Sequence, residues 1–393
     1  MGGKIFHTPM DSFHKAAFEC AITRRNFLRL AGLTGTSSAL LGFSPLIAQQ
    51  ILQRRKVVVV TFGGGARDEE TFAPQGQENI PNLITHLIPQ STFFTQVVNR
   101  GILGHYVATA SLATGVYERF DNFARVAPQN PTIFEYFRKD LQRPAEDAWV
   151  IAPSNGFNRI GQSDGSLFAS GYGAEVVLPK ELLASAVQQR LPHAGKLDFV
   201  LQDNYEDPFV TPPAANVSAQ LDRVQRLLRL SVDDFIAHAS TLSSADELSF
   251  FVMQQVMRQF APSLLWITLH DMDVAHTGAY SLYLDAIRRT DRLCAQIWQE
   301  IESNPEYKGR TTLAILPDFG RDSDLDGAGN GFQHHRTGDA LSRTTWMMAL
   351  GPGIRQNVTI DRQIQSLDLV PTIGAWLGAG TPQARGQRIQ EIL

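Results

Sequence analysis

The sequence predicts an α/β fold: a doubly wound, mostly parallel central sheet with helices on both faces. Strand-like runs alternate along the chain with helical runs, which is the order that such a sheet requires. Two of the runs, Lys56–Phe62 and Leu264–Leu269, are apolar or β-branched at nearly every position, as strands buried on both faces are. Charged side chains follow the second run at once, and ligands gather at the carboxyl ends of strands in these sheets.

Residues 1–48 are expected to be a twin-arginine signal peptide. The run T-R-R-N-F-L-R at residues 23–29 precedes a mildly apolar stretch and a small-residue cleavage point after Ala48. Glycines and a proline interrupt that stretch, which makes it a poor membrane-spanning helix. We therefore expect a periplasmic or secreted protein, exported by the twin-arginine translocation machinery, with no stable membrane span in its mature part.

Charge and cysteine content exclude several classes of protein. The formal net charge is −4, and residues 1–48 contain more basic than acidic side chains, so the rest of the chain is more acidic still. A nucleic-acid partner, which needs a net basic face, is therefore not expected. The two cysteines are Cys20, inside the signal, and Cys294, in a predicted helix. A disulfide or a thiolate metal cluster within the mature part is excluded.

The other elements are predicted from the spacing of apolar residues. Residues 214–239 and 244–261 are expected to form a helical insertion, and residues 280–301 a long helix with one apolar stripe. We find no repeat, low-complexity tract or flexible linker, so residues 49–393 are expected to form one domain. Further strands are expected at 91–98, 148–153, 311–316 and 344–350, and helices at 80–89 and 132–141.

A candidate metal site follows the strand Leu264–Leu269. The next seven residues contain His270, Asp271, Asp273 and His276. Two carboxylates and two imidazoles can supply oxygen and nitrogen ligands to one divalent cation. The alternative interpretation is an aspartate that caps the next helix, together with surface histidines.

Five runs, in their order along the chain, resemble the alkaline phosphatase and sulfatase superfamily. The resemblance covers nearly all of the chain after the signal, and it implies the alkaline phosphatase-like fold. More narrowly, the chain is similar to exported twin-arginine proteins of the DUF1501 type, whose E-F-G-R and D-H elements resemble D-F-G-R and Q-H-H here. The five runs are T-F-G-G-G-A-R at 61–67, H-Y-V-A-T-A-S-L-A-T-G at 105–115, D-M-D-V-A-H-T-G at 271–278, L-P-D-F-G-R at 316–321 and S-L-D-L-V-P-T-I-G-A-W-L-G at 366–378.

The resemblance implies ligands for a first metal site. Members of the superfamily usually hold two metal ions, and sulfatases hold one. The first site would take Asp271 or Asp273, together with His276 and His335, with His334 as a rival for the last position. The usual spacing between that Asp and its His is four residues. Here it is five or three, so the choice of aspartate stays open.

The second site of the superfamily is altered. Aligning A-S-L-A-T-G without gaps puts His105 at the position of the nucleophile, and the aspartate of the first strand falls on Gly63 or Gly64. A sulfatase of the formylglycine type is therefore excluded, and Asp318 is the one ligand that survives. His105, at a predicted helix start, would be a further ligand, a proton-transfer group or a nucleophile.

The implied function is a metal-dependent hydrolase of phosphate or related esters with an altered second site. Its substrate would be a small-molecule or glycan anionic ester, and its cofactor a divalent metal ion such as Zn²⁺, Mn²⁺ or Ca²⁺. The alternative is a non-catalytic binding or scaffolding protein on the same fold. Arg67 and Arg321 follow two strand ends, where they would pair with an anion or be ordinary surface arginines. The three glycines at 63–65 would let backbone N–H groups approach an anion, or they would form a tight turn after the strand.

Overall fold

The computed structural model describes residues 55–393, apart from 125, 154–156, 158, 166–167, 169–170, 192–194, 202–213 and 325–328. The predicted signal at residues 1–48 lies outside the described residues. Residues Gln49–Leu393 form one compact unit. No helix in the described part of the chain is both long enough and apolar enough to cross a membrane.

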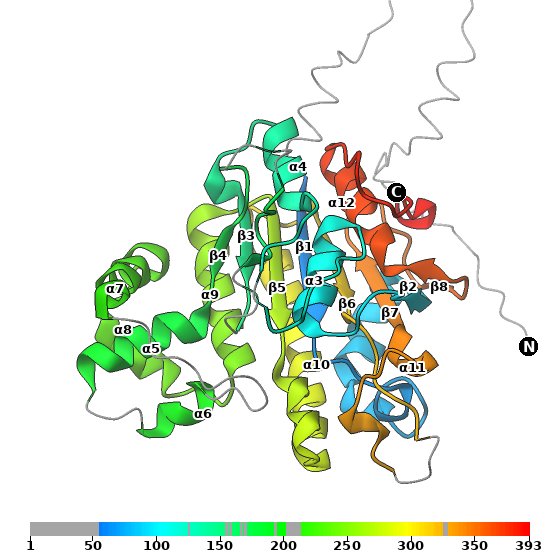
Figure 1. The fold of residues 1–393 in the computed structure, drawn as a ribbon, viewed down its shortest axis with the longest axis horizontal. Coiled ribbons are helices and arrows are strands. Elements are labelled where there is room, and N and C mark those ends of the chain that lie inside the picture. Colours follow the sequence, from blue (N-terminus) through cyan, green and yellow to red (C-terminus); the bar gives the residue numbers. More distant parts are fainter. Residues whose placement is uncertain are drawn as a thin grey trace, which may run out of the picture. The chain divides into compact units, whose positions relative to one another are not determined.

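Within the described residues, nine strands form one mixed sheet with helices on both faces, so the predicted fold class is confirmed (Figure 1). The order along the sheet is β4-β3-β5-β1-β6-β7-β2-β8, and β9 pairs with β2. Only β7 runs antiparallel to its described neighbours, β6 and β2. The strands are β1 (Lys56–Phe62), β2 (Ser91–Val98), β3 (Ala148–Ile151), β4 (Glu175–Val177), β5 (Leu264–Leu269), β6 (Thr311–Leu316), β7 (Thr344–Leu350), β8 (Val358–Ile360) and β9 (Ile364–Gln365).

The sheet separates two hydrophobic cores. Successive side chains of a strand point to opposite faces, so Val58 and Val60 of β1 enter one core while Val57 and Val59 enter the other. Helices α9 (Ala245–Phe260) and α10 (Tyr280–Ser303) contribute to the first core. The second core is covered by α3 (His105–Thr114), α4 (Ile133–Asp140) and α12 (Leu369–Leu377). Apolar residues on both faces explain why the central strands carry almost unbroken apolar runs.

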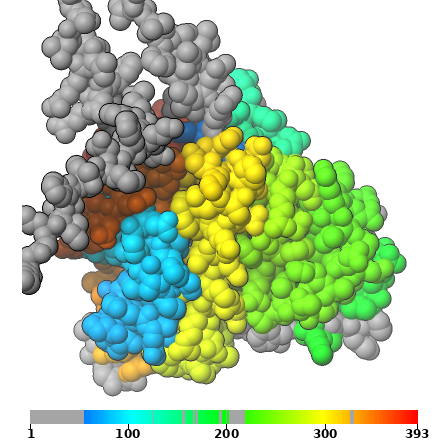
Figure 2. Space-filling model, turned by 180° about the vertical axis from the view of Figure 1, so that it is seen from behind, coloured from blue at the N-terminus to red at the C-terminus, as the bar shows by residue number. Residues whose placement is uncertain are grey.

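The helices predicted at 214–239 and 244–261 are present as α7 (Ala214–Leu228), α8 (Val232–Ala239) and α9. In Figure 1, α7 and α8 lie with α5 (Pro179–Arg190) beyond the β4 end of the sheet, and α5 packs against both. Helix α9 packs against α5 and α7 on one side and against β5 and α10 on the other, so it joins these helices to the sheet. Figure 2 shows α10, in yellow, between the green helices and the blue segment that follows β1.

The helical segment predicted at 80–89 is confirmed, although it is not a regular α-helix. The chain forms one π-helical turn at Leu83–Leu87 and a tighter turn at Ile88–Gln90. Pro89 has no backbone N–H and cannot continue an α-helix. The helix predicted at 132–141 is confirmed as α4, where the Thr132 hydroxyl accepts from the backbone N–H of Glu135 and the Glu135 carboxylate accepts from the N–H of Thr132.

The glycine run after β1 packs against the loop that follows β5. Gly64 has φ +90°, and a Cβ atom there would lie 2.8 Å from the backbone nitrogen of Asp273 and 2.9 Å from Cβ of Met272. Neither the backbone conformation nor the space suits another residue. The run therefore brings the end of β1 directly against the segment that carries the candidate metal ligands.

This packing predicts that Gly64→Ala lowers the free energy of unfolding more than the same substitution at a glycine of similar φ with open space around it. Gly353 has φ +87°, and a Cβ atom added there would meet nothing within 4 Å, so Gly353→Ala is the matched control. We expect about 1 kcal/mol lost at Gly353 from backbone strain, and about 2 to 4 kcal/mol at Gly64, where overpacking adds to the strain. Urea denaturation of both variants measures the difference. Equal losses would contradict the packing explanation.

Candidate metal centre

Four side chains from three separate segments converge at the carboxyl edge of the parallel strands. His105 is the first residue of α3, Asp273 and His276 lie in the turns directly after β5, and His335 follows a short turn after β6. One ligand atom from each of these four residues lies within 4.8 Å of the others. His105 and Asp273 are buried, and the other two are partly buried. The topology of the sheet thus gathers residues that are far apart in the sequence, as predicted for strand ends.

His276 lies at the centre of the closest contacts. Its Nε2 atom is 3.1 Å from Oδ1 of Asp273 and 2.9 Å from Nε2 of His335. The other ring nitrogen of His335, Nδ1, lies 2.8 Å from the carbonyl oxygen of Leu103. A carbonyl oxygen only accepts, so Nδ1 of His335 carries the proton and donates it. The Nε2 atom of neutral His335 then presents a lone pair to His276.

The electrostatic surroundings keep His335 neutral. Burial, and after it the positive charges of His105 and Arg321, lower the pKa of His335 to about 2. Its Nε2 lone pair is therefore available at neutral pH. Metal-binding histidines are held in this way, with the second ring nitrogen donating to a carbonyl or carboxylate.

The donor set fits a divalent cation. Ligand atoms around a tetrahedral zinc ion lie about 3.3 Å from one another, given zinc–nitrogen distances of about 2.0 to 2.1 Å. The contacts of His276 Nε2 with Asp273 and His335, at 3.1 and 2.9 Å, are slightly shorter than that. Two imidazole nitrogens and one carboxylate oxygen are the ligands of many catalytic metal sites. The cluster could therefore hold one cation with small adjustments of side chains.

His105 lies between two carboxylates. Its Nε2 is 2.9 Å from Oδ1 of Asp273, and its Nδ1 is 2.6 Å from Oδ2 of Asp318. Burial alone would lower the pKa of His105, but the two carboxylates outweigh burial and raise this pKa to about 10. His105 is thus an imidazolium that donates from both nitrogens. Asp318 lies outside the four-residue cluster and acts on it through its hydrogen bond with His105.

Arg321 is fully buried, and the prediction of a surface arginine is wrong. Its guanidinium donates to the carbonyl oxygens of Gly65, Phe332 and Met272, and to Oδ1 of Asp273 at 3.2 Å. The positive charge of the buried Arg321 therefore stabilises the Asp273 carboxylate. The charge of His105, together with the hydrogen bonds from His105 and His276, outweighs burial and holds the pKa of the Asp273 carboxyl well below its usual range.

Arg67 is also buried, so the prediction of a surface arginine is wrong there too. It forms ion pairs with Glu70 and, at 2.9 Å, with Asp324. Tyr283, on α10, accepts from the backbone nitrogen of Arg67. These contacts tie the segment after β1 to the loop after β6 and leave Arg67 engaged with protein groups.

The structure does not bring Asp271 into the cluster. Its carboxylate lies 2.9 Å from Nη1 of Arg289 on α10. The buried Asp246 of α9 accepts from the backbone nitrogens of His270 and Asp271, at 2.7 and 2.9 Å, and fixes the direction of the turn. Asp273 is the aspartate that faces His276.

The structure also distinguishes between the two neighbouring histidines His334 and His335. His335 joins the cluster, whereas the backbone of His334 bonds to Gly331 and Asp322. His270 lies beside the four-residue cluster, where its ring is edge-on to that of His105 with centroids 4.6 Å apart. The role of Asp246 could not be read from the sequence, because an acidic residue in the first turn of a helix is usually explained by the helix dipole.

Comparisons with known proteins support the fold. No protein-family profile matches the chain, and no curated protein sequence matches it. Among solved structures, wild type alkaline phosphatase PafA matches with a TM-score of 0.52 and 11% identity, over 86% of this chain and 99% of that chain. The phosphonate monoester hydrolase SpPMH from Silicibacter pomeroyi matches with a TM-score of 0.50 and 13% identity, over 85% and 75%. The phosphonate monoester hydrolase of Agrobacterium radiobacter also matches with a TM-score of 0.50 and 12% identity, over 86% of this chain and 76% of that chain.

These similarities show an alkaline phosphatase-like α/β fold. At such low identities they carry the fold and not the activity. The superfamily resemblance seen in the sequence is thus confirmed for the architecture. The narrower similarity to exported proteins of the DUF1501 type stays a prediction.

Proposed function

We propose that this protein hydrolyses phosphate esters or related anionic esters with one divalent cation held by Asp273, His276 and His335. The observation that supports the proposal is the position of His335: its Nδ1 faces the carbonyl oxygen of Leu103, and its Nε2 faces Nε2 of His276, which in turn lies beside Asp273. A cation bound there would polarise the ester and lower the pKa of water. Two imidazole ligands favour Zn²⁺ or Mn²⁺ over Ca²⁺, which takes oxygen ligands.

His105 is proposed to act through its proton and not as a nucleophile. Both nitrogens of His105 face carboxylates. Burial alone would lower the pKa of His105, but the two carboxylates outweigh burial and raise this pKa to about 10. An imidazolium has no lone pair with which to attack phosphorus. In this proposal His105 holds a proton at Nε2 beside the cluster, orients Asp273, and leaves the attack on the ester to water.

One observation favours the second candidate, a binding protein that does not catalyse. The positive charges of His105 and Arg321 already compensate Asp273, and His105 also compensates Asp318. In the superfamily pattern implied by the sequence, carboxylates at these positions would face cations. Protein side chains have taken over part of that role, and a fold can persist after its chemistry is lost.

Activity assays separate the two candidates. We expect the parent protein with added Zn²⁺ or Mn²⁺ to hydrolyse at least one aryl phosphate monoester, phosphodiester or sulfate. His276→Ala should lower kcat/KM roughly 100-fold or more, because even outer-shell changes cost 10- to 100-fold in metal sites. His334→Ala, whose side chain lies outside the cluster, is the matched control and should keep full activity. Equal background rates for the parent and His276→Ala on every substrate would leave the binding protein as the remaining candidate.

We also propose that the protein is exported by the twin-arginine route and acts in the periplasm or outside the cell. The motif at residues 23–29 supports this proposal. Replacing Arg24 and Arg25 together by lysine is expected to hold the precursor in the cytoplasm. Cell fractionation with immunoblotting measures this, and a precursor that still reaches the periplasm in full would refute the proposal.

A further inference from the structure

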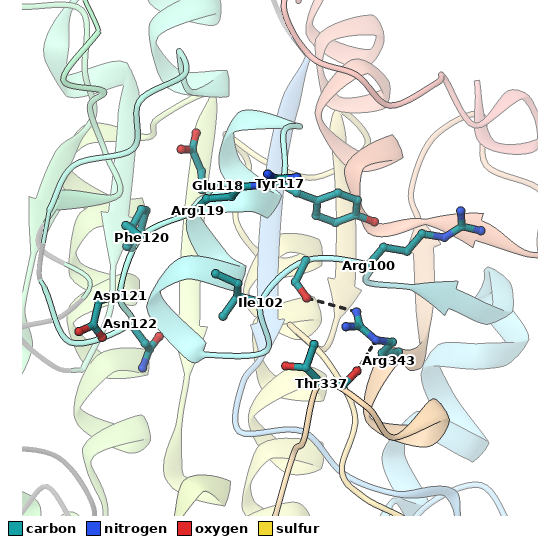
Figure 3. Close-up of a pocket in the computed structure, with 11 residues that line it drawn as sticks. Arg100, Ile102, Tyr117, Glu118, Arg119, Phe120, Asp121, Asn122, Thr337 and Arg343 are labelled. Carbon is teal, nitrogen blue, oxygen red and sulfur yellow. Dashed lines mark hydrogen bonds between the residues drawn. The ribbon is translucent and has the colours of Figure 1, made fainter.

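A surface cavity of about 730 Å³ lies beside the segment that leads to His105 (Figure 3). Because β7 runs antiparallel, its first residue lies at the same edge of the sheet as the last residue of β2. Residues that follow β2 and residues that precede β7 therefore meet at one place, and the turn after α3 closes the cavity. Among the residues that line it are Arg100, Ile102, Tyr117, Arg119, Thr337 and Arg343.

The arginines give the cavity unused hydrogen-bond donors. Arg343 donates through Nε to the carbonyl of Thr337, and through Nη1 to the carbonyls of Asn99 and Gly101. Its Nη2 atom has no partner among the described residues. Arg119 is exposed, and in the described part of the chain no carboxylate pairs with it. These carbonyl contacts fix the Arg343 guanidinium in place, so it offers a preorganised donor at low entropic cost.

The acidic residues that also line the cavity do not cancel this charge. The carboxylate of Glu118 accepts from the backbone nitrogens of Gln129 and Asn130, at 3.1 Å each. Oδ1 of Asp121 accepts from the backbone nitrogen of Phe123 at 3.0 Å. Figure 3 shows the side chains of Glu118 and Asp121 at the margins of the cavity, away from Arg343. The region around Arg343 is therefore positive.

Apolar groups lie next to the arginines. Ile102 is 42% exposed and lines the cavity, so it offers an apolar surface to a ligand. The ring of Tyr117 lies against the backbone of Gly101, where a Cβ atom would come within 2.8 Å of the ring. In Figure 3, Tyr117 and Arg119 lie on one side of the cavity, and Thr337 and Arg343 on the other. A ligand with both a charged and an apolar part would match these walls.

We propose that this cavity binds an organic anion. Its phosphate, sulfate or carboxylate group would pair with Arg343, the positive charge of Arg119 would attract it from the other side of the cavity, and its ring or hydrocarbon part would contact Ile102 and Tyr117. The volume lies within the range of about 300 to 1,000 Å³ that small-molecule sites occupy. No atom of the four-residue cluster lines the cavity. The site therefore needs no cation, and it stands whether or not the protein hydrolyses esters.

Calorimetric titration of the purified full chain, freed of metal with a chelator and dialysed, tests the proposal. The probes are 4-nitrophenyl phosphate, 4-nitrophenyl sulfate, 4-nitrobenzoate, neutral 4-nitrobenzyl alcohol, inorganic phosphate and inorganic sulfate. We expect the aryl anions to bind more tightly than the inorganic ions, and the neutral alcohol not to bind. Arg119→Gln should weaken binding of the aryl anions by about 10-fold, since it removes a positive charge from the wall of the cavity. Arg310→Gln, exposed at the opposite end of the parallel strands, is the matched control and should bind as the parent does.

Ile102→Ala separates the two parts of the site. It should weaken binding of the aryl anions and leave binding of the inorganic ions unchanged, because Ile102 offers only apolar contact. No binding of any probe at millimolar concentration would overturn the proposal, as would equal affinities of Arg119→Gln and Arg310→Gln. Inorganic ions that bind as tightly as the aryl anions would also overturn it, because the apolar wall would then contribute nothing.

Discussion

Replacing His276 or His335 by alanine is expected to lower the affinity for Zn²⁺ by more than about 100-fold, beyond the loss that outer-shell changes cause. Each imidazole places an Nε2 atom in the cluster, and the two atoms lie 2.9 Å apart. Removing either one leaves two of the three proposed ligand atoms, too few for a closed site. Competition with a chromophoric chelator, together with elemental analysis of the purified protein, measures the change.

The sequence itself supplies the matched controls. Asp271 and His334 were the rivals of Asp273 and His335, and the structure directs both rivals away from the cluster. Asp271→Asn and His334→Ala should therefore bind Zn²⁺ as the parent does. Full occupancy in His276→Ala and His335→Ala would rule out the site. A loss in the two controls that equals the loss in these variants would show that the cation binds elsewhere on the loop.

Arg321→Met is expected to lower the free energy of unfolding by about 3 to 5 kcal/mol, because one of the cations that compensate Asp273 is lost and buried carbonyl oxygens lose their donor. The Arg321 side chain is fully buried and donates to three carbonyl oxygens as well as to Asp273. Methionine fills much of the volume but satisfies none of these acceptors. Urea denaturation at neutral pH measures the change.

Arg321→Lys tests the cause of that loss. Lysine keeps the charge but lacks the planar fork that reaches several acceptors at once, so we expect it to restore only part of the stability. Arg310→Gln, at an exposed position, is the control and should change stability by less than about 0.5 kcal/mol. A loss at Arg321→Met no larger than this control would show that the buried guanidinium does not hold the loops together.

The long strands could be predicted because burial on both faces leaves a continuous run of apolar residues. β1 and β5 begin and end at the predicted residues, and so do β2, β6 and β7. The short strands β4, β8 and β9 were not predicted, since two or three residues carry no periodicity. The segment predicted at 80–89 is helical, but Pro89 lies in a tighter turn because it lacks the N–H that an α-helix needs.

The buried arginines show where reasoning from residue type fails. Charged side chains are almost never fully buried unless they are paired, so Arg67 and Arg321 were expected at the surface. Carbonyl groups of Gly65, Met272 and Phe332, from three separate loops, meet around the Arg321 guanidinium. No local pattern in the sequence marks such a convergence.

The sequence by itself determined that acidic and imidazole groups stand at the ends of buried strands, because strand burial and the residues that follow can both be read locally. Only the tertiary structure decided which groups meet. Asp246, 25 residues before Asp271, holds the turn so that Asp273 faces His276. His105 pairs with Asp318 across 213 residues. The direction of a side chain at the end of a strand depends on contacts with such distant segments, and those contacts exist only once the sheet has assembled.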